Sequence, residues 1–283
     1  MKISYNQACG LGCSTLEQDL ILTEQVGFDF IEIRLDMLKK YLENHTLEDL
    51  TYFFENSTIK PHAINAIYVY DEFLSENDDL SKQEELLAEF DFACDVARMI
   101  KSNHIILVPP LQRDGGPYIA NGRDTFENCT RILKKLAKRA EDVKICFELV
   151  GFDRSSVRSI EDAKAIVESV NLQNVGYVMD SYNIYLNGGT NDFSELKIID
   201  VSKLFAVHLM SGDDVCESER GQDKRCFCGN GVVDTDNFLR ILNQIGYDGM
   251  VSVETFRPEY WSKTPEWVIN EAYQTTKQAL QGK

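Results

Sequence analysis

Short apolar runs rich in β-branched residues alternate with longer amphipathic segments from one end of the chain to the other. The short runs predict eight strands, at residues 2–6, 28–34, 60–66, 104–108, 143–148, 175–180, 203–208 and 250–254. Between most of them apolar positions recur at helical spacing, which is typical of repeated βα units and a parallel sheet. Eight such units predict an α/β protein in which residues 1–283 form a single (β/α)8 barrel rather than an open sheet.

Cap residues mark the ends of the predicted helices. Thr15 can cap the first turn of one helix, and Gly27 can end it. Further helical patterns cover residues 82–100, 125–142, 159–171 and 234–246. The longest irregular stretches, 109–121 and 210–232, each follow a predicted strand, which in a barrel places them on the face where the strands end.

Four of the predicted strands end on a side chain that can bind a metal ion. These residues are Glu148, Asp180, His208 and Glu254. An acidic residue after one strand is more often a helix cap or a solvated loop residue, but four such residues on strands five to eight are hard to explain as independent accidents. Three carboxylates and one imidazole predict a site for one divalent ion, Zn²⁺, Mn²⁺, Mg²⁺ or Co²⁺.

A metal ion bound between two glutamates indicates a class of reaction. The ion can polarise a carbonyl group, and the flanking carboxylates can move protons between neighbouring carbons. This chemistry converts an aldose to a ketose, or one ketose to another.

Other polar residues near the predicted strand ends are weaker candidates. Asn6 and Asn65 end strands one and three, and they could orient substrate hydroxyls or serve the structure alone. His62 lies on strand three, where a hydrogen-bonded core histidine is the more frequent case and a substrate contact is the alternative. His45 and His104 are expected to be structural or solvated.

Several segments resemble one family of barrels, the xylose-isomerase-like TIM barrels, which include sugar isomerases, epimerases and apurinic endonucleases. The resemblance covers essentially the whole chain, is strongest to the inosose isomerases of inositol breakdown, and is carried by MKISYNQA, GFDFIEIR, HTLEDLTYFF, IKPHAINA, NVGYVMDS and DGMVSVETFRPEYW. It implies that the four strand-end residues are the metal ligands, with Glu148 and Glu254 also the acid/base pair. It also implies that Arg225 contacts substrate oxygens, and that a carbonyl shifts within a keto-inositol or similar polyol ketone through an enediolate.

The chain departs from the family pattern near the expected substrate. Asn183 stands where the family usually has a substrate-contacting histidine, and asparagine cannot titrate near neutral pH. Phe227 and Cys228 replace a Trp-Pro pair. Because these changes spare the metal ligands, they bear on the substrate more than on the reaction, and an epimerase or dehydratase of another hydroxy-ketone remains an alternative.

Two further alternatives are a repair nuclease on the same barrel and a sugar-binding barrel without turnover. A net charge of −17 and only four histidines argue against the nuclease, which needs a basic face for DNA and more metal ligands. The intact ligand set argues against loss of turnover.

Composition restricts the partners and the compartment. The negative charge disfavours nucleic acid and anionic membranes as partners. The expected partner, a small polyol ketone or sugar, is what the family resemblance implies. The chain has no signal-peptide pattern and no apolar run long enough to span a bilayer, so we expect a cytoplasmic protein. Because barrels of this kind often associate, it could form a homo-oligomer. Its eight cysteines are then expected to be reduced, with Cys226 and Cys228 as ordinary loop residues.

Overall fold

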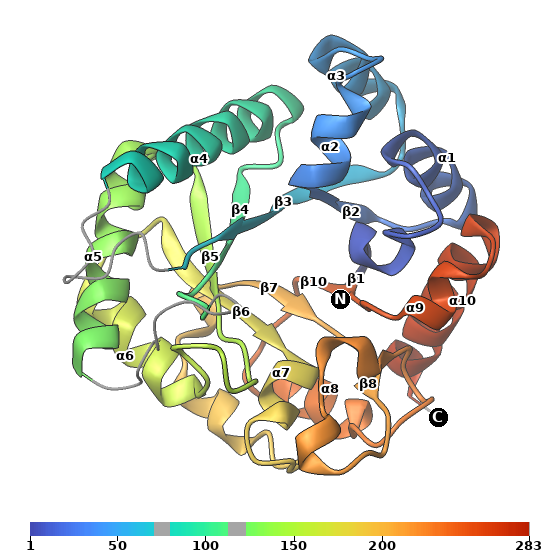
Figure 1. Cartoon of the computed structure of the whole chain (residues 1–283). Coiled ribbons are helices and arrows are strands. Elements are labelled where there is room, and N and C mark those ends of the chain that lie inside the picture. The colour runs from blue at the N-terminus through green and yellow to red at the C-terminus, as the bar shows by residue number, and fades with distance from the viewer. Residues whose placement is uncertain (71–79, 113–122, 283) are drawn as a thin grey trace.

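Eight parallel strands close into a barrel in the computed structural model, which describes residues 1–70, 80–112 and 123–282 (Figure 1). The strands are β1 (Lys2–Asn6), β2 (Phe30–Arg34), β3 (Lys60–Tyr68), β4 (His104–Val108), β5 (Lys144–Glu148), β6 (Val175–Asp180), β7 (Leu204–His208) and β10 (Met250–Val253). The first strand pairs with both β2 and β10, which closes the sheet. The predicted (β/α)8 barrel is therefore confirmed.

Helices surround the barrel, and the last of them, α10, packs beside the first (Figure 1). They are α1 (Leu16–Val26), α2 (Leu35–Tyr41), α3 (Leu47–Asn56), α4 (Leu80–Ile100), α5 (Arg123–Arg139), α6 (Ile160–Val170), α7 (Ser181–Leu186), α8 (Thr235–Gln244), α9 (Pro258–Trp261) and α10 (Pro265–Gln281). Among the described residues no helix is both long and apolar enough to cross a bilayer.

The predicted caps of the first helix are confirmed. Thr15 and Gln18 form a reciprocal capping box, and Gly27 ends α1 with φ of 103°, which a residue with a Cβ rarely adopts. The helix expected at 234–246 begins after Asp234, whose side chain caps it by accepting from the backbone N–H of Asn237, and Gly246 follows its end with φ of 81°. These signals depend on neighbours in the chain, which is why the sequence is enough to find them.

The irregular stretch 210–232 folds over the carboxyl ends of the strands. It contains a small antiparallel pair, β8 (Ser211–Gly212) and β9 (Arg225–Cys226), with short 3-10 turns between them. Gly231 lies so close to this pair that an added Cβ would be 2.1 Å from the carbonyl oxygen of Gly212. This segment brings Arg225 into the barrel. Most of the other irregular stretch, residues 113–121, lies outside the described residues.

All eight cysteines are free thiols. Cys226 and Cys228 are buried, and neither belongs to the group of potential metal ligands found among the described residues.

Asp19, on α1, has a fully buried carboxyl group whose side-chain hydrogen-bond partners lie outside the strand-end cluster. It accepts hydrogen bonds from Gln7 Nε2 and Ser14 Oγ, each at 2.7 Å. Burial nevertheless raises its pKa from 3.8 to about 7.

This raised pKa predicts a stability that depends on pH. Protonated Asp19 makes its full contribution to the free energy of unfolding below about pH 4. This contribution is lost as the pH rises toward 7, because over that interval the unfolded chain releases the proton while the folded chain retains it. We expect Asp19→Asn, which cannot ionise, to flatten the decline in unfolding free energy between pH 4 and 7, measured by urea denaturation. An unchanged slope in the variant would contradict the assignment.

Candidate metal centre and reaction cavity

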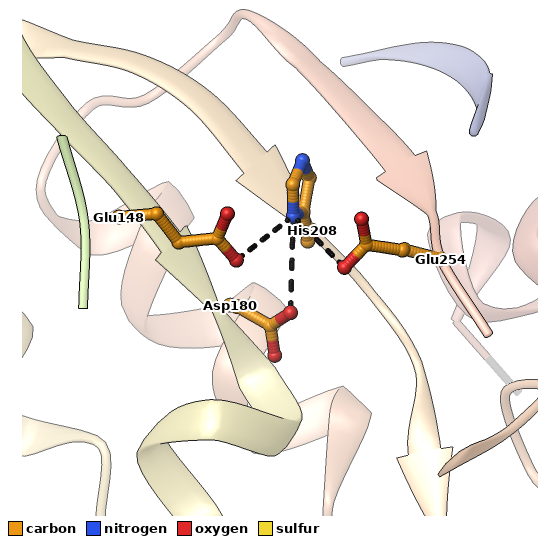
Figure 2. A group of neighbouring side chains, drawn as sticks. All are labelled: Glu148, Asp180, His208 and Glu254. Atoms are coloured by element: carbon orange, nitrogen blue, oxygen red, sulfur yellow. Dashed lines mark ion pairs between the residues drawn. The ribbon is translucent and has the colours of Figure 1, made fainter. Parts of the chain in front are cut away.

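The four strand-end residues meet inside the carboxyl end of the barrel. Their potential ligand atoms all lie within 4.8 Å of one another, and all four side chains are buried. The Nδ1 atom of His208 is 3.3 Å from a Glu148 oxygen, 3.5 Å from a Glu254 oxygen and 3.8 Å from an Asp180 oxygen. Figure 2 shows Glu148 and Glu254 on opposite sides of this nitrogen, with Asp180 between them.

The position of Asp180 follows from local sequence. It is the last residue of β6 and also the N-cap of α7, and its Oδ1 accepts a 2.7 Å hydrogen bond from the backbone N–H of Asn183. The cap holds one oxygen outside the cluster and turns the other, Oδ2, toward His208. Asp180 can therefore serve both as the N-cap of α7 and as a metal ligand.

The cluster fits a divalent cation. His208 Nδ1 is buried without a hydrogen-bond partner, and it faces oxygens of three buried carboxylates. Carboxylates at this spacing repel one another unless a cation lies among them, and a mixed shell of oxygen and nitrogen suits several divalent ions. Burial lowers the pKa of His208, but the charges of Glu32, Glu254 and Glu148 raise it well above its ordinary value overall. Metal binding at Nδ1 would therefore release a proton.

The other nitrogen of His208 faces a residue that the sequence reasoning missed. Its Nε2 lies 3.0 Å from Oε2 of Glu32, a fully buried acid on β2. Burial would raise the pKa of Glu32, but His208 and His62 lower it overall. The sequence offered one signal for Glu32, which is a charged residue between Ile31 and Ile33 in a predicted strand.

Asn6 and Asn65 join two of the carboxylates. Asn6 Nδ2 donates to Glu32 Oε2 at 2.9 Å and to Glu254 Oε1 at 2.8 Å. Asn65 Nδ2 donates to the same two oxygens, each at 3.3 Å. Both amides therefore touch a predicted metal ligand directly.

His62 lies on the other side of Glu32 from the metal cluster. Its Nδ1 is 3.4 Å from Glu32 Oε1, and its ring stacks on His104 with centroids 4.7 Å apart. It lines a cavity at the amino ends of the strands, whereas the predicted metal ligands lie at the carboxyl ends.

Arg225 is the cation nearest the carboxylates. Its Nη1 donates to Asp180 Oδ2 at 2.6 Å and to Glu254 Oε2 at 3.1 Å, and the side chain is 2% exposed. Burial would raise the pKa of Glu254, but His208 and Arg225 together hold it below its ordinary value. The pKa of Glu148 instead rises to about 7, because burial and the charges of Glu254 and Asp180 outweigh His208.

A chain of hydrogen bonds connects Arg225 to Glu148. Arg225 Nε donates to Gln222, whose amide donates to Asn183 Oδ1 at 3.2 Å. Asn183 Nδ2 then donates to Glu148 Oε1 at 3.2 Å. Gln222 was not predicted, and its loop position carries no pattern that would have indicated it.

A cavity of about 320 Å³ opens above this cluster. Its polar floor contains Asn65, Glu148, Asn183, Gln222, Arg225 and Glu254, and its walls include Tyr68, Val108, Leu111, Val150, Phe152, Phe256 and Trp261. Trp261 is held in place because its Nε1 donates to the carbonyl oxygen of Ala8 and its side chain packs on Gly12, where an added Cβ would lie 2.7 Å from the Cβ of Trp261 and 2.9 Å from the ring atom Cγ. The cavity has room for a small ring with one polar edge and one C–H face.

Comparisons with known proteins agree with this geometry. The profile of the family "Xylose isomerase-like TIM barrel" matches residues 20–275. The inosose isomerase of Halalkalibacterium halodurans is 33% identical over 99% of this chain and 96% of its own length, and that of Bacillus subtilis is 34% identical over 98% and 96%. A crystal structure of the IolI protein with a bound zinc atom is 33% identical, with a TM-score of 0.88 over 99% of this chain and 98% of that one. A solved L-ribulose 3-epimerase, 18% identical with a TM-score of 0.76, shares the fold.

The chain belongs to the xylose isomerase-like TIM barrel family. Within the family it is similar over its full length to inosose isomerases, and it is an isomerase whose buried Glu148, Asp180, His208 and Glu254 fit a single divalent ion.

Proposed function

We propose that this enzyme isomerises a keto-inositol by moving its carbonyl group to a neighbouring ring carbon. The observation that carries the proposal is the placement of two buried carboxylates, Glu148 and Glu254, on opposite sides of His208 Nδ1 beneath a cavity sized for a small ring. The full-length similarity to inosose isomerases supports this substrate class.

In the proposed site, Glu148, Asp180, His208 and Glu254 hold the divalent ion, which supplies a Lewis acid for the substrate carbonyl. One glutamate takes the proton from the hydroxyl-bearing carbon next to the carbonyl. The other glutamate, which starts protonated, gives its proton to the former carbonyl carbon, while the hydroxyl proton passes from one oxygen to the other. The two glutamates thereby exchange protonation states, and proton exchange with water restores them before the next turnover. Atoms and charge balance, so the reaction requires no redox cofactor.

Substrate orientation is proposed for the polar residues of the floor. Arg225, Asn183 and Asn65 line the cavity. Arg225 and Asn183 carry N–H donors for substrate oxygens, whereas Asn65, whose two amide hydrogens point to Glu32 and Glu254, can accept from a substrate hydroxyl through its Oδ1. Asn6 and His62, also predicted as substrate contacts, touch Glu254 or Glu32 instead, so any effect of theirs on the substrate would pass through those carboxylates.

Proton NMR in D₂O tests the reaction directly. We expect the zinc- or manganese-loaded enzyme to convert 2-keto-myo-inositol to a second inosose, with loss of the signal of the proton next to the carbonyl. Tight metal binding without conversion or exchange would reject this substrate and leave the metal site standing.

A ketose 3-epimerase is the second candidate. Proton transfer from opposite sides of a carbon inverts that carbon, and Glu148 and Glu254 lie on opposite sides of the cluster. A ketose 3-epimerase of Arthrobacter globiformis is 27% identical over 132 residues. In the same NMR experiment with a ketohexose, an epimerase would place deuterium on the inverted carbon and leave the carbonyl where it was.

Four expectations from the sequence stay predictions. They are one domain over residues 1–283, a cytoplasmic location, the absence of nucleic-acid or membrane partners, and self-association. The net charge of −17 supports the third.

A further inference from the structure

We infer that Glu32 is a positioning residue for the metal site: it holds His208 in the tautomer and orientation that point the Nδ1 lone pair at the metal. The inference rests on the proposed ligand set. It concerns a residue on β2, whereas the four proposed ligands come from β5, β6, β7 and the end of β10.

The two nitrogens of His208 have different surroundings. Nε2 makes a hydrogen bond of 3.0 Å with Glu32 Oε2, whereas Nδ1 makes none and lies 3.3 Å or more from the nearest carboxylate oxygens. A metal-bound imidazole retains one proton, on the nitrogen away from the metal. A carboxylate that accepts from that N–H fixes the ring and makes the ligand nitrogen more basic. Glu32 is the residue in position to do so.

The groups around Glu32 fix it as an acceptor. Asn6 Oδ1 accepts from the backbone N–H of Ala8 at 2.9 Å, so the amide cannot be reversed and its Nδ2 must donate to Glu32. Asn65 donates to the same oxygen. Two amide groups and His208 Nε2 therefore converge on Oε2 of Glu32, which is placed to accept from all three.

The same arrangement connects Glu32 to a second ligand. The Asn6 amide donates one hydrogen to Glu32 and the other to Glu254, at 2.9 and 2.8 Å. Displacing Glu32 would therefore disturb both the imidazole and Glu254. A purely structural carboxyl lacks these connections: Asp19 is equally buried, yet its side-chain partners are Gln7 and Ser14.

Glu32→Gln removes the charge with little change of shape. The glutamine oxygen can still accept from His208, and its NH₂ group can face Nδ1 of His62. We expect zinc to bind about 10–100-fold more weakly, measured by competition with a chromophoric chelator, with the circular dichroism of the metal-free protein retained. Asp19→Asn is the matched control, because it makes the same change in a buried carboxyl and should leave zinc affinity unaltered.

A spectroscopic measurement on the unmutated protein tests the tautomer independently of any variant's folding. The chain has four histidines, so ¹⁵N-histidine labelling gives a spectrum simple enough to assign with His208→Gln. With zinc bound, we expect His208 to carry its proton on Nε2 and to coordinate through Nδ1. A proton on Nδ1, or zinc on Nε2, would overturn the inference.

The outcomes separate the inference from the proposed function. If Glu32→Gln binds zinc within twofold of the unmutated protein while His208→Gln loses it, the role of Glu32 is rejected and the ligand set stands. If His208→Gln binds zinc normally, the ligand set is wrong and the inference falls with it.

Discussion

Glu254→Gln is expected to lower kcat by about 10²–10⁴-fold and to abolish deuterium exchange into the substrate. The amide keeps the size of the side chain but cannot take the substrate proton. Its oxygen can still accept from Asn6 and Asn65, which donate to Glu254 Oε1, so the fold should survive. The measurement is substrate–solvent exchange by proton NMR, with the zinc content of each sample determined separately because Glu254 is also a proposed ligand.

Two comparisons make this result specific. Asp19→Asn should retain activity, since its buried carboxyl touches none of the proposed ligands. Saturating metal should leave the defect of Glu254→Gln in place, whereas a variant impaired only in metal binding would recover. Full exchange in the metal-loaded glutamine variant would refute an acid/base role for this residue.

Arg225→Met is expected to destabilise the metal-free protein by about 3–5 kcal/mol, because it removes the guanidinium group that hydrogen-bonds two buried carboxylates. Arg225 donates to Asp180 at 2.6 Å and to Glu254 at 3.1 Å. For a chain of this length the loss corresponds to a fall in Tm of about 5–8 °C. A bound divalent ion would replace the missing positive charge, so zinc should raise the Tm of the variant more than that of the unmutated protein.

Arg257→Met is the matched control for this prediction. Arg257 pairs with Asp213 at 2.9 Å, but the two side chains are 18% and 31% exposed, so water screens the pair. Its loss is expected to cost less than about 1 kcal/mol. Thermal unfolding with and without zinc measures both variants, and equal losses of Tm would contradict the argument from burial.

The strands, the helix ends and the strand-end residues could be predicted because each is marked by residues that lie close together in the chain. A strand buried on both faces appears as a short apolar run, and a helix end is marked by caps such as Thr15 and Gly27, which interact with residues only a few positions away. Glu148, Asp180, His208 and Glu254 could be singled out for the same reason, since each directly ends a strand run and the ends of parallel strands meet at one face of a barrel.

The contacts between distant segments could not be found in this way. Gln222 lies in a loop, and its partners Asn183 and Arg225 are visible only once that loop folds over the strand ends. His62 could be read as a substrate contact or a core residue, because strand alternation says which side chains point inward without saying how deep in the barrel each one lies.

The sequence by itself determined the eight strands, the helix caps and the four acidic or imidazole groups at the strand ends, because each depends on neighbours in the chain. Only the tertiary structure decided which groups surround them. Glu32 reaches His208 across 176 positions, and Asn6 reaches Glu254 across 248. These contacts exist because the barrel closes β1 against β10, and the strength of a buried charge depends on such neighbours rather than on its place in the chain.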